Sequence, residues 1–554
     1  MSSKPMAPHT NFGPDFTFAY DDWITHPDGL GTVPQGRHGT TVAIIGAGAA
    51  GLIAGYELMK MGLKPVFYEI GEFGGRLRSR EFAGAEGVIA ELGGMRFPVS
   101  SAGFYHYIEK LGIESQPFPN PLTKAAGSTV IDLLGETYYA ETASDLPSVF
   151  RDVAQAYDQA LEEGAQFSDL KAAIRARDAK RIKEIWNPIV RAWDEKSFYD
   201  FIASSSSFQK LEFRHREIFG QVGFGTGGWD SDFSNTMLEI LRVNVCELDD
   251  DQRFMVGGVQ QMPRKLWTHA PEKLQHWPEG TTLSQLNSGA PRSGVVRISR
   301  QADGAFNLVD QWGREDTFGS VIVTCQTHLL TTAIDTDEQI FDQSLWMALD
   351  RTRYMQSSKT FVMVDRPFWK DKHPHTGRDV MSMTLTDRMT RGTYFFDNGP
   401  DKPSVICLSY SWMTDALKML PLPIEKRVSL ALSTLAKIYP DVDIASHILG
   451  EPITVSWEDD PNFLGAFKGA LPGHYRYNHR MYSHFMQAEM PPEQRGIFLA
   501  GDGISWTPAW VEGAVQTGLN AVWGVMNHFG GQSPKTNPGP GERYAEFGPV
   551  ELPD

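Results

Sequence analysis

The spacing of three glycines suggests a specific chemistry for this sequence. Gly46, Gly48 and Gly51 follow a short apolar run, and the acidic Glu69 comes 23 residues after Gly46. The first glycine permits a tight turn, the second lets a pyrophosphate approach the backbone, and the third lets a helix pack closely on a strand. Free amides at the start of that helix would face the phosphates, and Glu69 is placed to accept hydrogen bonds from a ribose diol. The spacing therefore predicts a dinucleotide site.

The segments around these glycines predict a complete strand–helix–strand unit. Residues 42–45 are a β-branched apolar run typical of a buried parallel strand, residues 52–59 have helical spacing, and residues 65–68 form a second strand. A GxGxxG pattern alone is weak evidence, but within such a unit it is specific. Residues 321–325 and 496–502 are predicted to be further buried strands of the same domain.

Two other glycine-rich segments carry charged side chains. Gly75 and Arg76 can bring a backbone amide and a guanidinium group to a second phosphate face. The loop at residues 224–233 carries Asp230 and Asp232, which would either line a pocket or belong to a solvent turn, where Asp is favoured for its local hydrogen bonds.

Composition limits the class of protein. The 554 residues suggest two or more domains, and 41% hydrophobic with 21% charged residues is typical of a globular protein. A formal net charge of −17 disfavours a nucleic-acid partner. The three cysteines lie far apart, which excludes a cysteine-rich metal site or a disulfide framework and favours a reducing cytoplasm. Without a signal region or an apolar run of about 18 residues, we expect no membrane span.

Beyond these patterns, the sequence resembles the flavin amine oxidases of the monoamine oxidase and L-amino-acid oxidase superfamily. Within it, the chain is similar to the bacterial L-amino-acid 2-monooxygenases, and most of all to those that act on L-lysine. The resemblance covers nearly the whole chain. Besides the segments above, it rests on residues 91–98, 355–359, 408–412, 465–468, 500–502 and 510–514.

The resemblance implies FAD as the cofactor. The covalent members of the superfamily attach flavin through a cysteine near the C-terminus, and because no cysteine follows Cys407 we expect non-covalent FAD. Val296 would meet the adenine through its backbone, and the helix from Val511 onward would direct its first amides at a flavin oxygen. The expected FAD-binding residues are Gly46, Gly48, Gly51, Glu69, Gly75, Arg76, Gly94, Met95, Arg96, Val296, Gly501, Asp502, Trp510 and Val511.

Oxidation of an amino acid by a flavin requires that the substrate be oriented by its carboxylate. Arg96 fits this task through its rigid bidentate fork, with Tyr410 as a second donor; a structural ion pair with Glu91 is the alternative. The resemblance assigns Lys359 the role of holding a water over the flavin and promoting the reaction with dioxygen. The alternative is a surface lysine, which is common at the start of an apolar strand.

The side chain of the substrate would lie in an aromatic slot. Trp412 and Trp510 are expected to wall this slot, with ordinary core packing as the competing interpretation. A desolvated ammonium needs a counter-charge. Asp232 is the expected partner of the lysine ε-ammonium, and Asp230 is the alternative. Cys325 is expected to be a small core residue rather than a nucleophile.

The expected fold class is α/β, with a Rossmann-like FAD-binding domain built from discontinuous segments, a mixed α+β substrate domain and a helical lid subdomain. The lid is inferred from charged helical patterns at residues 145–220 and from the family. The expected divisions are an extended N-terminal arm at 1–40, FAD-binding parts at 41–110, 251–335 and 486–530, a lid and substrate part at 111–250, a substrate-binding domain at 336–485 and a Pro/Gly-rich tail at 531–554.

These expectations combine in one predicted reaction. It is the oxidative decarboxylation of L-lysine by dioxygen to 5-aminopentanamide, carbon dioxide and water, through hydride transfer from the α carbon to flavin. The alternatives are a deaminating L-amino-acid oxidase that forms keto acid, ammonia and hydrogen peroxide, a monooxygenase for another amino acid such as tryptophan, and a non-catalytic dinucleotide-binding protein. The family suggests a homodimer whose partners are an L-amino acid and dioxygen. The composition predicts a cytoplasmic protein with no nucleic-acid or membrane partner.

Overall fold

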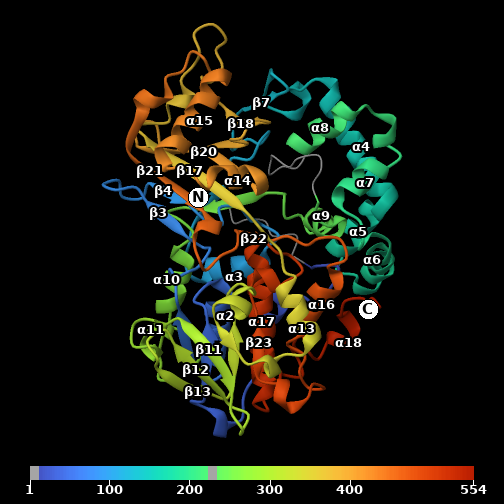
Figure 1. The fold of residues 1–554 in the computed structure, drawn as a ribbon, viewed down its shortest axis with the longest axis vertical. Helices are drawn as coiled ribbons and strands as arrows, with labels where there is room; N and C mark the ends of the chain where they lie inside the picture. Colours follow the sequence, from blue (N-terminus) through green and yellow to red (C-terminus); the bar gives the residue numbers. More distant parts are fainter. Residues whose placement is uncertain (1–11, 223–233, 554) are drawn as a thin grey trace.

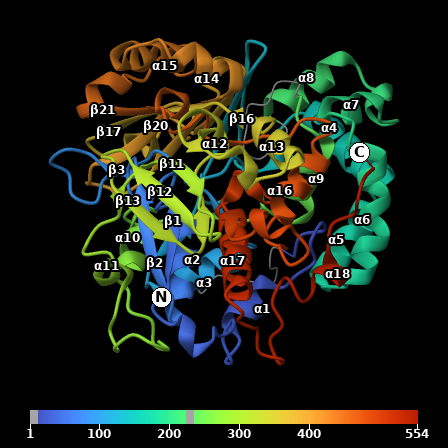
Figure 2. The same ribbon diagram turned by 60° about the horizontal axis from the view of Figure 1, so that its bottom comes forward.

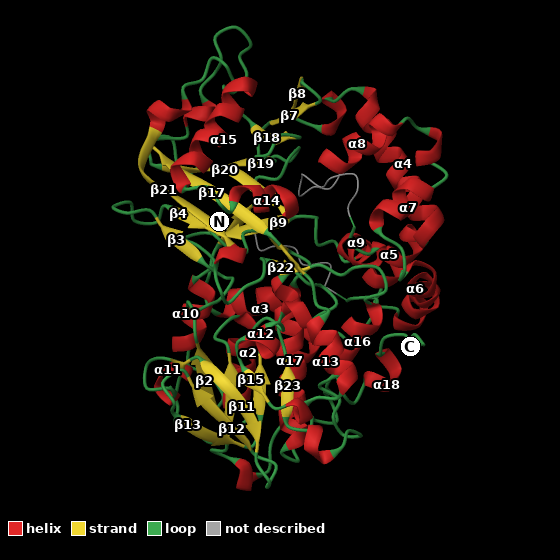
Figure 3. Cartoon of the chain, in the orientation of Figure 1, coloured by secondary structure: helices red, strands yellow, loops and turns green. Residues whose placement is uncertain are grey.

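The computed structural model describes residues 12–222 and 234–553, and its regular elements gather in three regions. In Figure 1 a sheet covered by helices fills the bottom, a second sheet lies at the upper left, and a group of helices lies at the upper right. Figure 3 separates the two clusters of strands clearly. The predicted fold class is confirmed.

The first region is a five-stranded parallel sheet assembled from distant segments. The predicted strand–helix–strand unit is present, and its two strands pair in parallel from Thr41 opposite Lys64 to Ile45 opposite Tyr68. Residues 42–45 and 66–68 of these strands are at most 5% exposed, as expected for a sheet covered on both faces. The strand order is β10–β2–β1–β14–β23, where β1 is Thr41–Ile45, β2 Lys64–Glu69, β10 Arg292–Ser293, β14 Val321–Val323 and β23 Ile497–Leu499.

Two helices, α2 (Ala49–Lys60) and α17 (Val511–His528), lie against each other on this sheet. Glycines permit the close approach. A β-carbon on Gly518 would lie 2.8 Å from the carbonyl oxygen of Ala50, and one on Gly55 would collide with the ring of Phe67 in β2. The contact brings the C-terminal part of the chain to the glycine-rich turn near its beginning.

An antiparallel ribbon extends beside the parallel sheet, at the lower left of Figure 3. Its strands β11 and β12 pair antiparallel, and β13 continues the ribbon. The ribbon comprises β11 Val295–Arg300, β12 Phe306–Asp310, β13 Glu315–Phe318 and the short β15 Asp335–Thr336.

The second region is a seven-stranded mixed sheet. Its strand β17 (Ser357–Val364), the second from one edge, is buried along its whole length, between β20 (Ser404–Trp412) and β21 (Ile448–Ser456). Helices α14 (Met413–Met419) and α15 (Ile424–Ile438) lie near these strands at the top of Figure 2. The sheet is completed by β19 Gly392–Phe396, β18 Met383–Thr386, β7 Thr129–Leu133 and β8 Glu136–Ala140.

The third region is the helical lid. Its helices are amphipathic, with apolar residues such as Ile182, Ile185 and Trp186 buried and charged residues exposed. Among the described residues, no helix is both long enough and apolar enough to cross a membrane. The lid helices are α4 Ser148–Ala165, α5 Phe167–Arg175, α6 Ala179–Trp193, α7 Phe198–Ser204, α8 Phe213–Val222 and α9 Met237–Val245.

Both ends of the described chain pack on the body. Phe16 and Trp23 of the N-terminal segment are 4% and 2% exposed. Asp15 forms a buried ion pair with Arg242 of α9, so the N-terminal segment helps to stabilise a lid helix. Near the C-terminus, the carbonyl oxygen of Gly548 accepts a hydrogen bond of 2.9 Å from Lys183 Nζ of α6.

Candidate active site

A cavity of about 290 Å³ lies where the three regions meet. Its dinucleotide end is formed by the glycine-rich turn and the segment before α17, and its other end by β17, β20 and α9. Of the residues nominated from the sequence, those that line it are Gly46, Gly48, Glu69, Gly75, Arg76, Gly94, Met95, Arg96, Lys359, Tyr410, Trp412, Gly501, Asp502, Trp510 and Val511.

The glycine-rich turn is tight and tied to the acid at the end of β2. Gly46 has a φ of +108°, which favours glycine. The Ala47 amide donates to Glu69 Oε2 at 2.7 Å, and the Gly71 amide donates to Glu69 Oε1 at 2.8 Å. Gly51 faces the strand instead of the cavity, since a β-carbon there would lie 3.0 Å from Ile44 Cγ2. The glycines therefore have the geometry that the motif requires.

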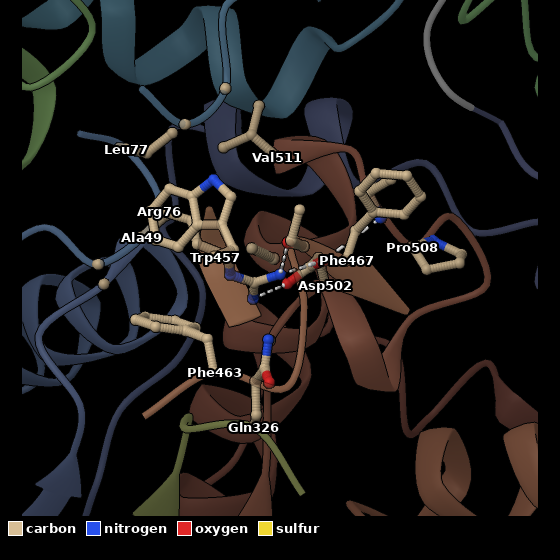
Figure 4. A pocket seen from close by; sticks show the side chains of 18 of the residues that line it. Ala49, Arg76, Leu77, Gln326, Trp457, Phe463, Phe467, Asp502, Pro508 and Val511 are labelled. Carbon is tan, nitrogen blue, oxygen red and sulfur yellow. Dashed lines mark hydrogen bonds and ion pairs between the residues drawn. The ribbon is translucent and has the colours of Figure 1, made fainter. Parts of the chain in front are cut away.

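Arg76 and Asp502 face each other in the middle of Figure 4. Arg76 donates from both terminal nitrogens to the two carboxylate oxygens of Asp502, and Arg76 Nη1 also reaches the Ala466 carbonyl oxygen at 2.9 Å. Trp457 and Phe463 lie nearby in the same view. The ion pair fixes one wall of the dinucleotide end.

Arg96 enters the cavity from a cage of aromatic rings. Its guanidinium carbon lies 5.4 Å from the ring centres of Phe118 and Tyr410 and 5.5 Å from that of Tyr394. The side chain is buried, and its Nη1 has no hydrogen-bond partner among the described residues. A buried donor of this kind is costly unless a ligand accepts its hydrogen bond. The expected alternative, an ion pair with Glu91, is wrong for the described structure.

Lys359 is buried on β17 rather than at the surface. Its Nζ donates to the carbonyl oxygen of Glu91 at 3.1 Å and to that of Gly93 at 2.5 Å. Burial lowers the pKa of Lys359 to about 8. The carboxylate of Glu91 accepts hydrogen bonds from Ser79 Oγ and from the Val259 amide, at 2.7 and 2.8 Å. An ammonium has three protons, so one proton of Lys359 stays available to the cavity that this residue lines.

Tryptophans and the start of α17 complete the walls. Trp412 packs edge-on against Tyr410, with ring centres 4.9 Å apart. Trp510 directly precedes α17, and both Trp510 and Val511, the first residue of the helix, line the cavity. The turn before it contains Ala509 at a φ of +73°, and the Ala509 amide donates to Asp502 Oδ2 at 3.2 Å. This contact positions the helix N-terminus.

Some nominated residues do not line the cavity. Val296 is a half-buried residue of β11 and is not among the lining residues. Asp230 and Asp232 lie outside the described residues. Conversely, Cys325 was expected in the core but lines the cavity half-buried, and burial raises the pKa of its thiol to about 12. A thiol with this pKa is not a nucleophile at neutral pH.

Sequence reasoning missed several lining residues. Gln326 follows the predicted strand at residues 321–325, and ligands commonly bind beyond the carboxyl ends of parallel strands, so its position was a usable signal. Ile240 and Val243 line the cavity from one face of α9, but their spacing resembles that of any buried helix face. The other missed residues include Glu239, Asp249, Trp457, Phe463 and Phe467.

The expected FAD fits this cavity. A β-carbon on Gly48 would meet no atom within 4 Å, and one on Gly75 would lie 3.6 Å from the α carbon of Gly48, so bare backbone faces the lumen from two segments. Such backbone suits a pyrophosphate, and Glu69 keeps acceptor capacity for a ribose. Arg96, Lys359 and Tyr410 gather at the opposite end, where a substrate would meet the flavin ring.

Comparisons with known proteins agree with an FAD-binding protein. Residues 49–526 match the family model described as flavin containing amine oxidoreductase. The chain is 31% identical over 545 residues to the tryptophan 2-monooxygenase of Pseudomonas savastanoi, covering 92% of this chain and 93% of that protein. It is 26% identical over 507 residues to an L-amino-acid oxidase of Mus musculus, covering 88% and 71%.

A solved structure shares the fold. Cyclohexylamine oxidase from Brevibacterium oxydans superposes with a TM-score of 0.62 and 16% identity, over 89% of this chain and all of that chain. At this identity the likeness concerns the fold alone.

Proposed function

The chain belongs to the flavin-containing amine oxidoreductase family and depends on FAD, and we propose that it oxidises L-lysine to 5-aminopentanamide. The related proteins support amino-acid 2-monooxygenase or oxidase chemistry on an amine substrate. The lysine substrate rests on the sequence resemblance and on the acidic character of the chain, whose net charge of −17 favours cationic substrates.

One observation carries the proposal. The unpartnered Nη1 of Arg96 and the buried ammonium of Lys359 belong to one cavity, together with a glycine-lined dinucleotide end. A dinucleotide-binding protein without catalytic activity would have no use for either buried cation at this end of the cavity. Their joint presence favours an enzyme that binds a carboxylate and reacts with dioxygen.

Arg96 binds and orients the substrate. Its guanidinium donates hydrogen bonds to the α-carboxylate, and the hydroxyl of Tyr410 adds a second donor. The surrounding rings of Phe118, Tyr394 and Tyr410 stack on the guanidinium and exclude water from it. When bound, FAD takes a hydride from the α carbon and passes the electrons to dioxygen. No dedicated base is needed if the α-amine is already neutral.

Lys359 holds a water at the reacting face. Two of its protons are held by main-chain carbonyl oxygens, which fixes the direction of the third. The positive charge beside the reacting centre favours the charge that develops as dioxygen is reduced. Its position on a fully buried strand keeps this geometry rigid.

Closure of the cavity decides the product. If the imino acid stays in the cavity with peroxide, attack and loss of carbon dioxide give the amide and water. If it escapes first, hydrolysis gives the keto acid and ammonia. The lid helices would set this residence time.

Product analysis of lysine turnover under air tests the proposal. We expect 5-aminopentanamide and carbon dioxide in equal amounts, with little ammonia or peroxide. Ammonia and peroxide as the main products would instead identify a deaminating oxidase. A second candidate, tryptophan 2-monooxygenase activity, is favoured by the 31% identity to the Pseudomonas savastanoi enzyme. A higher kcat/KM for tryptophan than for lysine would contradict the lysine proposal.

A further inference from the structure

Glu512 is a buried carboxylate that joins the N-terminal ends of two helices. It lies in the first turn of α17 and is 2% exposed. Its Oε2 accepts a hydrogen bond of 2.8 Å from the Phe104 amide, and its Oε1 accepts one of 3.2 Å from the Gly103 amide. Both amides belong to the first turn of α3 (Ala102–Lys110), where the amides of a helix have no partner within it. The side chain therefore anchors one helix end to the other.

The two helices come close together at this point. A β-carbon on Gly103 would lie 2.8 Å from Glu512 Oε1 and 3.1 Å from Val515 Cγ1, so a larger residue would displace the carboxylate or the helix. Burial raises the pKa of Glu512 to about 7, and the hydrogen bonds from the two amides oppose this rise. Hydrogen bonds from amides to a carboxylate are stronger than those between neutral groups. Glu512 and Gly103 thus fix the spacing between α3 and the start of α17.

On one side of this contact, α3 holds the segment of Arg96. Arg96 directly precedes β5 (Phe97–Pro98). The ring of Phe104 stacks on that of Phe97 with centres 4.9 Å apart, and the Tyr105 hydroxyl donates to the Phe97 carbonyl oxygen at 2.8 Å. The residue that binds the carboxylate through its amide thus also packs on the neighbour of Arg96. The first turn of α3 therefore helps to position the arginine that the proposed function assigns to the substrate carboxylate.

On the other side, Glu512 belongs to the dinucleotide end of the cavity. Val511 directly precedes it and lines the cavity, where Figure 4 shows its side chain. Further along α17, Thr517 Oγ1 accepts from the Gly501 amide at 2.9 Å, so the start of the helix is also held to the segment of Asp502. Glu512 itself is not among the residues that line the described cavity. It therefore acts on a bound ligand only through the two segments that it joins.

Hydride transfer requires that the donor carbon and the flavin be held in one alignment, and a displacement of about 1 Å lowers such a rate about 100-fold. Resting on the proposed function, we propose that Glu512 is a positioning residue, which sets the alignment of the flavin with the substrate carboxylate at Arg96. Because Glu512 touches neither ligand, its loss lowers the rate of hydride transfer and leaves the affinities for substrate and FAD nearly unchanged. A residue that only stabilised the fold would lower the melting temperature without this selective loss of rate.

Glu512→Gln tests this role. The new side chain has nearly the same size, but it presents one acceptor oxygen and one NH₂ donor where the carboxylate has two acceptors, so one amide of α3 loses its partner. We expect the limiting rate of anaerobic flavin reduction by lysine to fall at least about tenfold, with the Kd values for lysine and FAD within about threefold of native. A rate within about threefold of native overturns the proposal, as does a rise in the Kd for lysine as large as the loss in rate.

The absorption spectrum of the bound flavin gives a readout that does not depend on turnover. Hexanoate has the carboxylate of a substrate but no α-amine, so it binds at Arg96 without being oxidised. We expect the change in the flavin spectrum on hexanoate binding to have a different shape in Glu512→Gln, at an unchanged Kd for hexanoate. An identical spectral change in both proteins overturns the proposal. If lysine does not reduce the native enzyme, the proposed lysine oxidation fails, while this spectrum still tests Glu512.

Two further variants separate alignment from stability. Gly103→Ala displaces the Glu512 carboxylate without removing its charge, so we expect the limiting rate to fall at least about tenfold here too, and this variant decides the test if Glu512→Gln does not fold. Glu57→Gln is the matched control, because Glu57 of α2 is also 2% exposed and binds α3 away from its first turn, through the Tyr107 hydroxyl at 3.0 Å. Glu57→Gln should lower the melting temperature without lowering the rate. An equal loss of rate in Glu57→Gln and Glu512→Gln overturns the proposal.

Discussion

The guanidinium of Arg76 and the carboxylate of Asp502 form a bidentate ion pair across 426 residues of sequence. Asp502 also accepts from the Ala509 amide in the turn before α17. One carboxylate therefore joins the first dinucleotide-binding segment to the helix that returns to the cavity. We expect FAD binding to depend on this ion pair, because the two segments that it connects lie far apart in the sequence.

Replacing Asp502 tests the role of this ion pair in FAD binding. In Asp502→Asn the guanidinium loses its counter-charge and the turn before α17 loses an acceptor, so we expect the Kd for FAD to rise about tenfold or more, equivalent to at least about 1.4 kcal/mol. Titration of the apoprotein with FAD measures this. Asp371→Asn is the control, because it breaks the exposed bidentate pair with Arg366 far from the cavity. An unchanged Kd in Asp502→Asn would contradict the assignment.

Replacing Arg96 tests carboxylate binding. The side chain introduced in Arg96→Lys lacks the planar fork of a guanidinium. We therefore expect kcat/KM for the substrate to fall about 100-fold or more, while the FAD content stays near that of the native enzyme. Anaerobic reduction of the bound flavin at varied substrate concentration separates the binding loss from the loss in rate. Arg253→Lys is the matched control, since Arg253 is a half-buried arginine of strand β9 (Gln252–Met255) that donates hydrogen bonds to Ser115. Similar effects of both changes would disprove the special role of Arg96.

Replacing Lys359 tests the reaction with dioxygen. In Lys359→Met we expect the second-order rate constant for reoxidation by dioxygen to fall about 100-fold, with little change in the rate of reduction by substrate. Because burial lowers the pKa of Lys359 to about 8, the ammonium is charged below that pH and neutral above it. The native reoxidation rate should therefore decline as pH rises through about 8. Stopped-flow reoxidation from pH 6 to 10 measures this, and a decline that persists in Lys359→Met would show that another group titrates.

The sequence was sufficient for elements that carry a local signal. The glycine turn, its two strands and its helix are recognisable because each glycine has a steric reason for its position. The burial of Lys359 was not recognisable, since a lysine beside Ser358 and Thr360 has the same local pattern at a surface or in a core. Its burial depends on the distant segment of Glu91 and Gly93, whose carbonyl oxygens accept hydrogen bonds from its Nζ.

The lid side of the cavity was the least predictable part. Asp249 lies in an acidic turn, a composition typical of solvent loops, and yet it lines the cavity. Val296 illustrates the opposite case, where a position nominated by resemblance does not line the described cavity. Contacts between segments far apart in the chain leave no periodic pattern in either of them.

The N-terminal segment offers a test of lid stability. Asp15 is 1% exposed and accepts from Arg242 of α9 and, at 2.9 Å, from Trp186 Nε1 of α6. Asp15→Asn removes the ion-pair partner of the buried Arg242, so we expect the lid to lose about 3 kcal/mol of stability. Hydrogen exchange of the α9 amides should become faster. Asp22→Asn removes an exposed ion pair to Arg177 and should leave this exchange unchanged. Unchanged exchange in Asp15→Asn would exclude this support of the lid.

The mode of FAD attachment gives the last prediction. Among the described residues the only thiol that lines the cavity is Cys325, beside the glycine turn, and its pKa of about 12 leaves almost no thiolate to attack a flavin. Cys246 and Cys407 are buried in the core. We therefore expect all flavin to pass into the filtrate when the enzyme is denatured in guanidinium chloride and filtered. Flavin retained by the denatured native chain but not by denatured Cys325→Ser would reveal a covalent bond to that thiol. Release of flavin from both chains would agree with non-covalent binding by the Arg76–Asp502 ion pair, the glycine backbone and Glu69.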